Sequence, residues 1–288
     1  IAGKGPSAFA GPLAPLVSGL LDRVIERCGT GAALRHALGP PPLDLLIDTQ
    51  STARTALALR GLGARRFVTA AAWGLPGAPP HFAPRTPRHL VRRLLALLER
   101  AIGPVPETPA GLRLPVDIAS RAAALLPAGP AYVAQVLGAG GRHKVWPEAR
   151  HLALARNLFA AGRTPVFILG PDEQDRHAPL AAALPGARFP LQEAGAAPPI
   201  LTIALARRCR AAVAADCGGG HMMAAADIPL VSLFGPTDPG KFAPWTPMAR
   251  ILRAQDFPGD GMLAIPVAAV QDALRQIERP GANEGESA

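Results

Sequence analysis

The feature that most constrains the fold is an alternation, across residues 131–235, of short apolar runs with segments of helical periodicity. Strands that alternate with helices of this length form parallel sheets with right-handed crossovers. We therefore predict a Rossmann-like α/β domain in this half of the chain. The expected strands are 131–140, 164–170, 210–216 and 228–235, and the expected helices are 147–162, 173–184, 200–209 and 219–227.

The first half shows the same alternation of apolar runs and helical segments over a shorter stretch. An apolar run at 43–48, a helical segment at 52–63 and a second run at 65–70 predict one strand, helix, strand unit. A proline-rich loop at 76–87 leads to a helical segment at 88–103 with one basic face. A chain of 288 residues suits two domains, which we place at 1–125 and 126–279, followed by a disordered tail at 280–288.

Composition narrows the class of protein. No apolar run approaches the roughly 18 to 20 residues that span a bilayer. Three cysteines, without paired or metal-ligand spacing, indicate a reducing compartment, and we expect a cytoplasmic protein without a disulfide or a metal site. The chain begins at Ile1 without an initiator methionine or a signal peptide, so we expect an incomplete N-terminus.

The basic excess lies in the first half. Residues 1–128 carry 15 Lys or Arg against 7 Asp or Glu, whereas residues 129–288 carry 15 against 14. This asymmetry is compatible with nucleic acid, anionic lipid headgroups or an acidic substrate, and equally with a solvated basic face. A nucleic-acid partner is the least favoured, because only 5% of residues are aromatic and they do not interleave with the basic ones.

Ligands in open α/β sheets bind at the carboxyl ends of the strands, so the loops there carry the candidate site. After the run that ends near Leu137, Gly140, Gly141 and Lys144 are suited to a phosphate, although a tight turn explains the glycines as well. After the next run, Glu173 follows Asp172 at the expected start of a helix. A carboxylate there binds ribose hydroxyls or, as an alternative, caps the helix.

The densest group of candidates follows the run 210–216. Successive glycines expose backbone N–H groups, and a helix that begins there directs partial positive charge at an anion. We expect Asp216 to accept loop N–H groups and His221 to donate to a phosphate; a flexible turn with a capping aspartate is the alternative. A rigid turn is expected beside this loop, and its Thr237 binds the ligand or, as an alternative, caps locally. The members of the group are Asp216, Cys217, Gly218, Gly219, Gly220 and His221.

These loops, in this order, resemble the heptosyltransferase family of lipopolysaccharide core assembly (glycosyltransferase family 9). The most specific part is DCGGGHMMAAADIPLVSLFGPTDP, with support from Lys144, Trp146 and Pro147, from GPDE and from LDLLIDTQSTARTALALR. The resemblance implies the GT-B fold, in which two Rossmann-like domains with parallel sheets face a cleft, and here the first strand and helix of the N-terminal domain would be missing.

The resemblance also implies the chemistry. It implies an inverting, metal-independent transfer of a heptose from a nucleotide sugar, ADP-heptose, to a lipopolysaccharide core acceptor, with no cofactor. Lys144 would stabilise the leaving diphosphate, the loop from Asp216 to His221 would bind it, and Glu173 would bind the nucleoside. The basic first half would bind the anionic acceptor and rest peripherally on the inner membrane, through Arg54, Arg88, Arg92 and Arg93.

Two departures from the family pattern keep an alternative open. The general base of the family is an aspartate in a Gly-Asp turn after the first strand, and no equivalent of that turn occurs in this sequence. Cys217 replaces the usual hydroxyl residue of the glycine-rich loop. A non-catalytic nucleotide-sugar-binding protein is therefore the alternative, and a nicotinamide-dependent oxidoreductase is a third hypothesis that rests only on the Rossmann-like rhythm.

Overall fold

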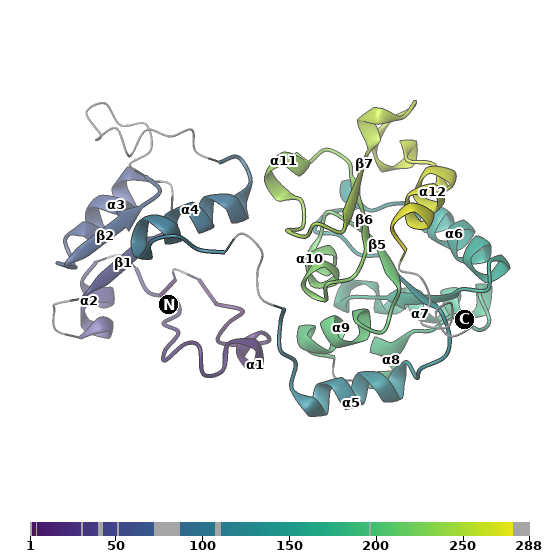
Figure 1. The fold of residues 1–288 in the computed structure, drawn as a ribbon, viewed down its shortest axis with the longest axis horizontal. Helices are drawn as coiled ribbons and strands as arrows, with labels where there is room; N and C mark the ends of the chain where they lie inside the picture. Colours follow the sequence, from purple (N-terminus) through teal and green to yellow (C-terminus); the bar gives the residue numbers. More distant parts are fainter. Residues whose placement is uncertain are drawn as a thin grey trace, which may run out of the picture. The chain divides into compact units, whose positions relative to one another are not determined.

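The computed structural model shows two compact units, Ile1–Ala110 and Gly111–Ala288 (Figure 1). The division falls before the boundary that we expected between residues 125 and 126, because the helix α5 (Val116–Leu125) packs on α9 (Pro199–Ala206) of the second unit. The expected tail at 280–288 lies outside the described residues. The structure describes residues 2–3, 5–29, 31–39, 43–50, 52–71, 87–106, 111–195 and 197–278.

The first unit contains the predicted strand, helix, strand arrangement. Strand β1 (Leu45–Asp48) pairs in parallel with β2 (Arg66–Thr69), and α3 (Ala53–Arg60) connects them. Helix α4 (Leu90–Ile102) packs on both strands and buries Leu97 against Val68. Asp48 ends β1 and is buried, with its carboxylate accepting a hydrogen bond from the Thr69 hydroxyl at 2.8 Å. Two short helices, α1 (Ala14–Val17) and α2 (Ala32–Leu38), precede this sheet.

The second unit is built on a five-stranded parallel sheet with the order β4-β3-β5-β6-β7. The chain leaves β3 toward β4 and then crosses to β5 on the other side of β3. The carboxyl ends of β3 and β5 therefore form a topological switch point, which is where open α/β sheets bind ligands. The strands are β3 (Tyr132–Val136), β4 (Thr164–Ile168), β5 (Ala211–Ala215), β6 (Leu230–Phe234) and β7 (Ala249–Arg253).

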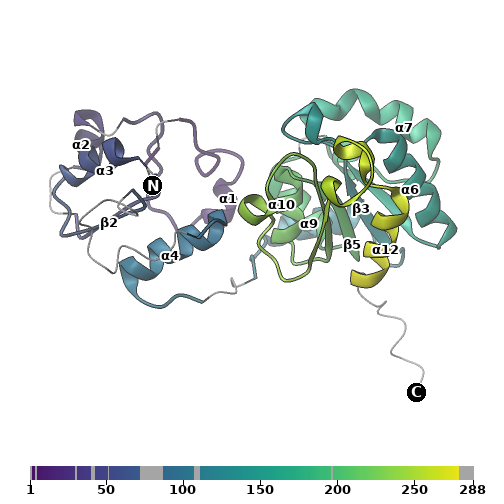
Figure 2. The ribbon, with the colours of Figure 1, turned by 90° about the horizontal axis from the view of Figure 1, so that it is seen from above.

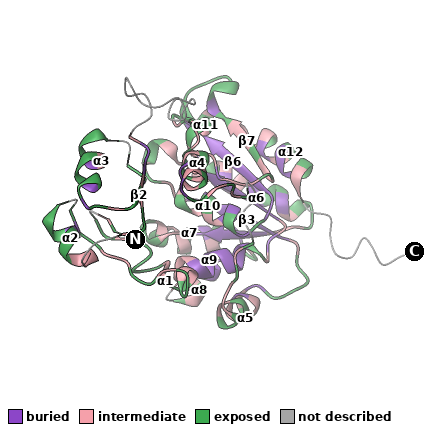
Figure 3. Ribbon diagram, turned by 60° about the vertical axis from the view of Figure 1, so that its left-hand side comes forward, coloured by how far each residue is buried: buried purple, intermediate pink, exposed green. Residues whose placement is uncertain are grey.

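Helices cover both faces of this sheet (Figures 1 and 2). Helices α6 (Glu148–Ala160) and α12 (Val267–Ile277) contact each other on one face, and α9 and α10 (Gly218–Ala225) contact each other on the other. The central strands are consequently buried along their whole length, as Figure 3 shows. This burial on two faces explains why their sequences are continuously apolar rather than alternating.

The expected helix at 173–184 forms in two pieces. Residues Pro171–Arg176 form a 3-10 helix, η3, and only His177–Ala183 form the α-helix α7. Further elements complete the unit: the short helices α8 (Pro190–Ala194) and α11 (Pro239–Phe242), and the 3-10 helices η2 (Arg142–Lys144), η4 (Ala254–Asp256) and η5 (Gly261–Ala264).

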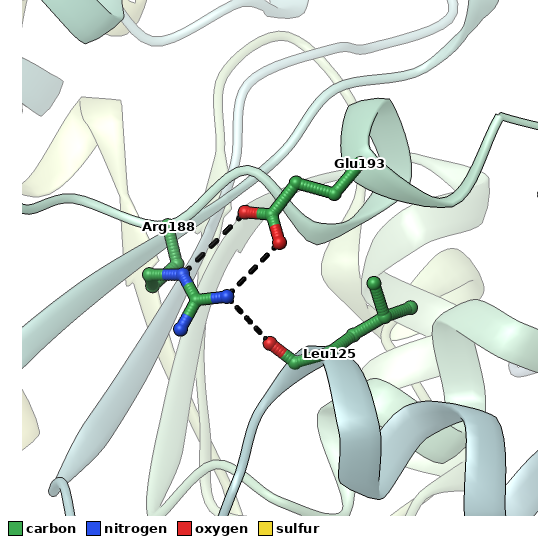
Figure 4. A network of polar contacts seen from close by, with 3 residues as sticks. All are labelled: Leu125, Arg188 and Glu193. Atoms are coloured by element: carbon green, nitrogen blue, oxygen red, sulfur yellow. Dashed lines mark hydrogen bonds and ion pairs between the residues drawn. The ribbon is translucent and has the colours of Figure 1, made fainter.

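Arginine side chains connect the segment around α5 to the rest of the second unit. The Arg188 guanidinium donates to the Leu125 carbonyl at 2.7 Å and to the Glu193 carboxylate at 2.9 Å (Figure 4). Arg121 donates to the Ala194 carbonyl, and Arg208 donates to that of Leu126. The bonds to Leu125 and Leu126 satisfy carbonyls at the end of α5, and the bond from Arg121 satisfies one at the end of α8. A helix C-terminus leaves such carbonyls without intrahelical partners.

Candidate anion-binding site

Four loops that carry the predicted residues meet at the carboxyl edge of the second sheet. The loop after β3 contacts the other three: Gly138 contacts Glu173, Lys144 contacts Asp216, and the carbonyl of His143 lies beside Gly235. Parallel strands bring their carboxyl ends to one edge, so residues far apart in sequence become neighbours here. The structure therefore brings together the loops of the second half that the sequence singled out.

An ion pair joins the loops after β3 and β5 at the switch point. The Lys144 ammonium lies 2.8 Å from a carboxylate oxygen of Asp216, and the two residues are 72 positions apart in sequence. The side chain of Asp216 is 9% exposed and that of Lys144 is 23% exposed, so the ammonium is the more accessible partner. The pair holds the Lys144 ammonium at the edge of the sheet.

Helix α10 begins directly after β5 and contributes a second positive element. Cys217 is its N-cap, and the Cys217 sulfur accepts the Gly220 N–H at 3.4 Å. The expectation that Asp216 accepts loop N–H groups was wrong, because its carboxylate binds Lys144 instead and the thiol caps the helix. The N–H groups of the first turn have no acceptor within the helix, and they carry its partial positive charge.

The three glycines of the loop have different roles. A Cβ at Gly219 would lie 2.5 Å from a Val136 methyl group, and one at Gly220 would lie 3.1 Å from the Ala215 carbonyl. These two positions are glycine because α10 packs closely on β3 and β5. Space around Gly218 is open, and so is the space around Gly140, which is also exposed. Gly218 and Gly140 are thus the positions at which backbone can approach a ligand.

Glu173 lies between the loops after β3 and β4. Its carboxylate accepts the Gly170 N–H at 3.0 Å and occupies the space where a Cβ of Gly138 would lie, at 2.6 Å. A carboxylate therefore caps this segment, but it is that of Glu173, whereas the capping alternative assigned the role to Asp172. Burial raises the pKa of the Cys217 thiol, with smaller increases from Asp216 and Glu173. Both carboxylates thus lie within electrostatic reach of Cys217.

The turn after β6 is supported by the segment that follows β7. The Gln255 side chain donates to the Gly235 carbonyl at 2.6 Å, and Met262 packs where a Cβ of Gly235 would lie. The Thr237 hydroxyl is buried without a hydrogen-bond partner among the described residues. Sequence reasoning did not find Gln255 and Met262, because no local pattern connects them with the turn.

Trp146 connects the turn that contains Lys144 to the segment at Ile265. Its indole N–H donates to the Ile265 carbonyl at 3.0 Å, and the residue is buried, so Trp146 has a packing role. His151 contacts the indole edge and lies 3.0 Å from the Gln135 amide oxygen. Burial lowers the pKa of His151 to about 3, with a smaller contribution from Arg176. His151 is accordingly neutral and structural.

The remaining predicted residues lie at the edge of the site or in the first unit. Gly141 contacts the His143 ring, and His221 is exposed in the first turn of α10. In the first unit, a cavity of about 890 Å³ runs along β1 and is lined mainly by aliphatic side chains. The arginines expected to bind an acceptor lie on α3 and at α4: Arg54, Arg88 and Arg92 are exposed, and Arg93 is half-buried.

The described residues contain neither a cluster of metal ligands nor a helix that could span a membrane. No group of three or more His, Cys, Asp or Glu side chains with the arrangement of a metal site occurs in that part of the chain. None of the helices described has the length and apolarity that crossing a bilayer requires.

The fold and the site together define a Rossmann-like α/β class of protein, with a lysine and a helix N-terminus at the switch point of the sheet. A family model described as glycosyltransferase family 9 (heptosyltransferase) matches residues 32–259, and the chain belongs to this family. The chain is 30% identical over 253 residues to lipopolysaccharide heptosyltransferase 1 of Pseudomonas aeruginosa, which covers 81% of the chain. It spans 65% of the length of that relative.

Solved structures confirm the fold. The glycosyltransferase family 9 protein of Veillonella parvula matches with a TM-score of 0.71 and 16% identity, over 92% of this chain and 86% of that one. E. coli ADP-heptose lps heptosyltransferase II matches with a TM-score of 0.63 and 20% identity, over 93% of this chain and 87% of that one. E. coli heptosyltransferase WaaC with ADP matches with a TM-score of 0.61 and 19% identity, over 96% of this chain and 98% of that one. The predicted α/β fold with parallel sheets, of the GT-B kind, is confirmed.

Proposed function

We propose that the protein transfers a heptose from a nucleotide sugar, ADP-heptose, to a lipopolysaccharide core acceptor. The observation that carries this proposal is the Lys144 ammonium at the switch point, next to the glycine-rich start of α10. A diphosphate is an anion suited to both elements. Membership of the heptosyltransferase family and the ADP named for the E. coli structure support the same donor.

The reaction would be a single displacement with inversion. The acceptor hydroxyl oxygen forms a bond to the anomeric carbon while the bond from that carbon to the diphosphate oxygen breaks, and ADP leaves. Negative charge grows on the diphosphate, and Lys144 with the N–H groups of α10 would stabilise it. The proton of the acceptor hydroxyl passes to a general base; the family resemblance gives this role to the aspartate of a Gly-Asp turn that has no equivalent in this sequence.

The other predicted residues take supporting roles in this proposal. Glu173 would bind the nucleoside through the carboxylate oxygen that does not accept the Gly170 N–H. Thr237 would lie beside the diphosphate. Arg54, Arg88, Arg92 and Arg93 would bind the anionic core acceptor and the cytoplasmic face of the inner membrane. No step needs a cofactor, a metal ion or nucleic acid, so a chelator is expected to leave the rate unchanged.

The experiment that tests the proposal measures release of ADP. The protein is incubated with ADP-heptose and a truncated core acceptor, with chelator present in a parallel reaction. Acceptor-dependent release of ADP and a mass increase of one heptose on the acceptor are expected. No release with any core acceptor contradicts transfer, and a rate that falls with chelator contradicts the metal-independent step.

A non-catalytic nucleotide-sugar-binding protein is the second candidate. The observation that favours it is that Cys217 uses its sulfur to cap α10, where the family places a hydroxyl residue. Removal of a general base typically costs about 10² to 10⁴ in rate, so a protein without one binds donor and turns over poorly. Calorimetry that shows binding of ADP-heptose, together with no transfer, favours this candidate.

A further inference from the structure

The ion pair between Lys144 and Asp216 is asymmetric in its exposure. The Asp216 side chain is 9% exposed, whereas that of Lys144 is 23% exposed, and 2.8 Å separates the charged atoms. A ligand that enters from solvent therefore meets the ammonium more readily than the carboxylate. Asp216 is also held by its backbone, because its N–H donates to the Leu233 carbonyl of the neighbouring strand at 3.1 Å. Its position is fixed by the sheet.

Charge excludes Asp216 as a direct ligand of a diphosphate. Two negative groups at contact distance repel each other, and the repulsion grows as water is excluded. The Glu173 carboxylate adds to the negative charge near the start of α10, since both carboxylates act on the Cys217 thiol. Lys144, at the switch point, is a cation that is already charge-paired and still accessible.

We propose that Asp216 is a positioning residue: it holds the Lys144 ammonium at the start of α10, where the ammonium contacts the donor diphosphate. This inference rests on the proposed function. Without the carboxylate, the four-carbon stem of lysine samples many rotamers, and ordering it on binding weakens affinity. With the carboxylate, the ammonium is in place before the ligand arrives, and its other N–H donors remain for the diphosphate.

The test measures affinities for ADP and for AMP by calorimetry with the full chain. Asp216→Asn, Lys144→Met and the double variant are compared with wild type. Because a hydrogen bond to a charged group contributes about tenfold or more, we expect Asp216→Asn to weaken ADP binding about tenfold. AMP binding, which lacks the second phosphate, should change less than ADP binding. The double variant should bind ADP no more weakly than Lys144→Met alone.

A matched ion pair controls for general effects on the fold. Arg163 and Glu278 are 2.7 Å apart with similar side-chain exposures, 33% and 14%, and Arg163 immediately precedes β4, at the amino end of the strands. Glu278→Gln should leave ADP affinity unchanged. Asp216→Glu, which keeps the charge, should recover part of the affinity that Asp216→Asn loses. Recovery of this kind is not expected if residue 216 only stabilises the fold.

Three results overturn the inference. Tighter ADP binding by Asp216→Asn shows that repulsion of the ligand dominates. Additive losses in the double variant show that Asp216 acts independently of Lys144. Equal losses for ADP and AMP show a general effect on the site. If the wild-type protein binds ADP and one of these three results is obtained, the inference about Asp216 is wrong and the proposed function still stands. If the wild-type protein binds no ADP, both the inference and the proposed function are contradicted.

Discussion

Gly219 packs so closely against Val136 that a Cβ on the glycine would lie 2.5 Å from a valine methyl group. Contacts this short do not occur between real atoms, so α10 must shift if residue 219 acquires a side chain. The contact ties the first turn of α10 to the end of β3. Gly219 is therefore required for packing, in contrast to Gly218, whose surroundings are open.

The first prediction concerns these glycines. We expect Gly219→Ala to lower the free energy of unfolding by about 1 to 3 kcal/mol, the usual cost of overpacking. Gly218→Ala should change stability by less than about 1 kcal/mol, because alanine favours a helix and meets no atom there. It should nevertheless weaken ADP binding, since its methyl group occupies the open side of the loop. Urea denaturation and ADP titration of both variants check this, and equal stability of the two variants contradicts it.

The second prediction concerns the thiol that caps α10. Burial raises the pKa of Cys217, so the thiol remains protonated at neutral pH and alkylation by iodoacetamide should be slower than for a free thiol. Cys217→Ser supplies a better N-cap and should stabilise the protein, whereas Cys217→Ala removes the cap and should cost about 1 kcal/mol. Thermal melts of both variants measure the difference. A serine variant less stable than the alanine variant contradicts the capping role.

Sequence patterns predict the features of the site that local contacts determine, but not those that depend on contacts between distant parts of the chain. The position of Asp216 at a strand end and the start of α10 follow from local patterns, so the loop was found. The pairing of Lys144 with Asp216 depends on the order of strands in the sheet, and no local pattern encodes it. The packing of Met262 on Gly235 is of the same kind.

Domain limits illustrate the same difference. Prolines around α5 suggest a linker, yet the helix belongs to the second unit because Arg188 binds the Leu125 carbonyl and Arg121 binds that of Ala194. Arginine is abundant along the chain, so composition did not distinguish these residues from exposed ones. Likewise, a proline at the start of 171–176 is compatible with an α-helix, and the capping bond from Gly170 to Glu173 is visible only in the structure.

The third prediction concerns the Arg188 network. We expect Arg188→Met to lower the free energy of unfolding by about 1 to 3 kcal/mol, because it leaves the Leu125 carbonyl and the Glu193 carboxylate without their shared donor. Amide hydrogen exchange in α5 should become faster than exchange in β5. Arg275→Met is the control, since its ion pair with Asp272 is exposed and should contribute little. An equal effect of both substitutions argues against the network.

The fourth prediction concerns acid stability. The pKa of His151 is lowered from 6.5 to about 3 in the folded protein, so the unfolded chain binds a proton on this residue in a pH range where the folded one does not. Its contribution to stability is present above pH 6.5 and is lost as the pH falls toward 3, with a limiting slope of about 1.4 kcal/mol per pH unit. Between pH 7 and pH 4.5, the melting temperature of wild type should therefore fall more steeply than that of His151→Gln. Parallel pH profiles would show that another group controls acid stability.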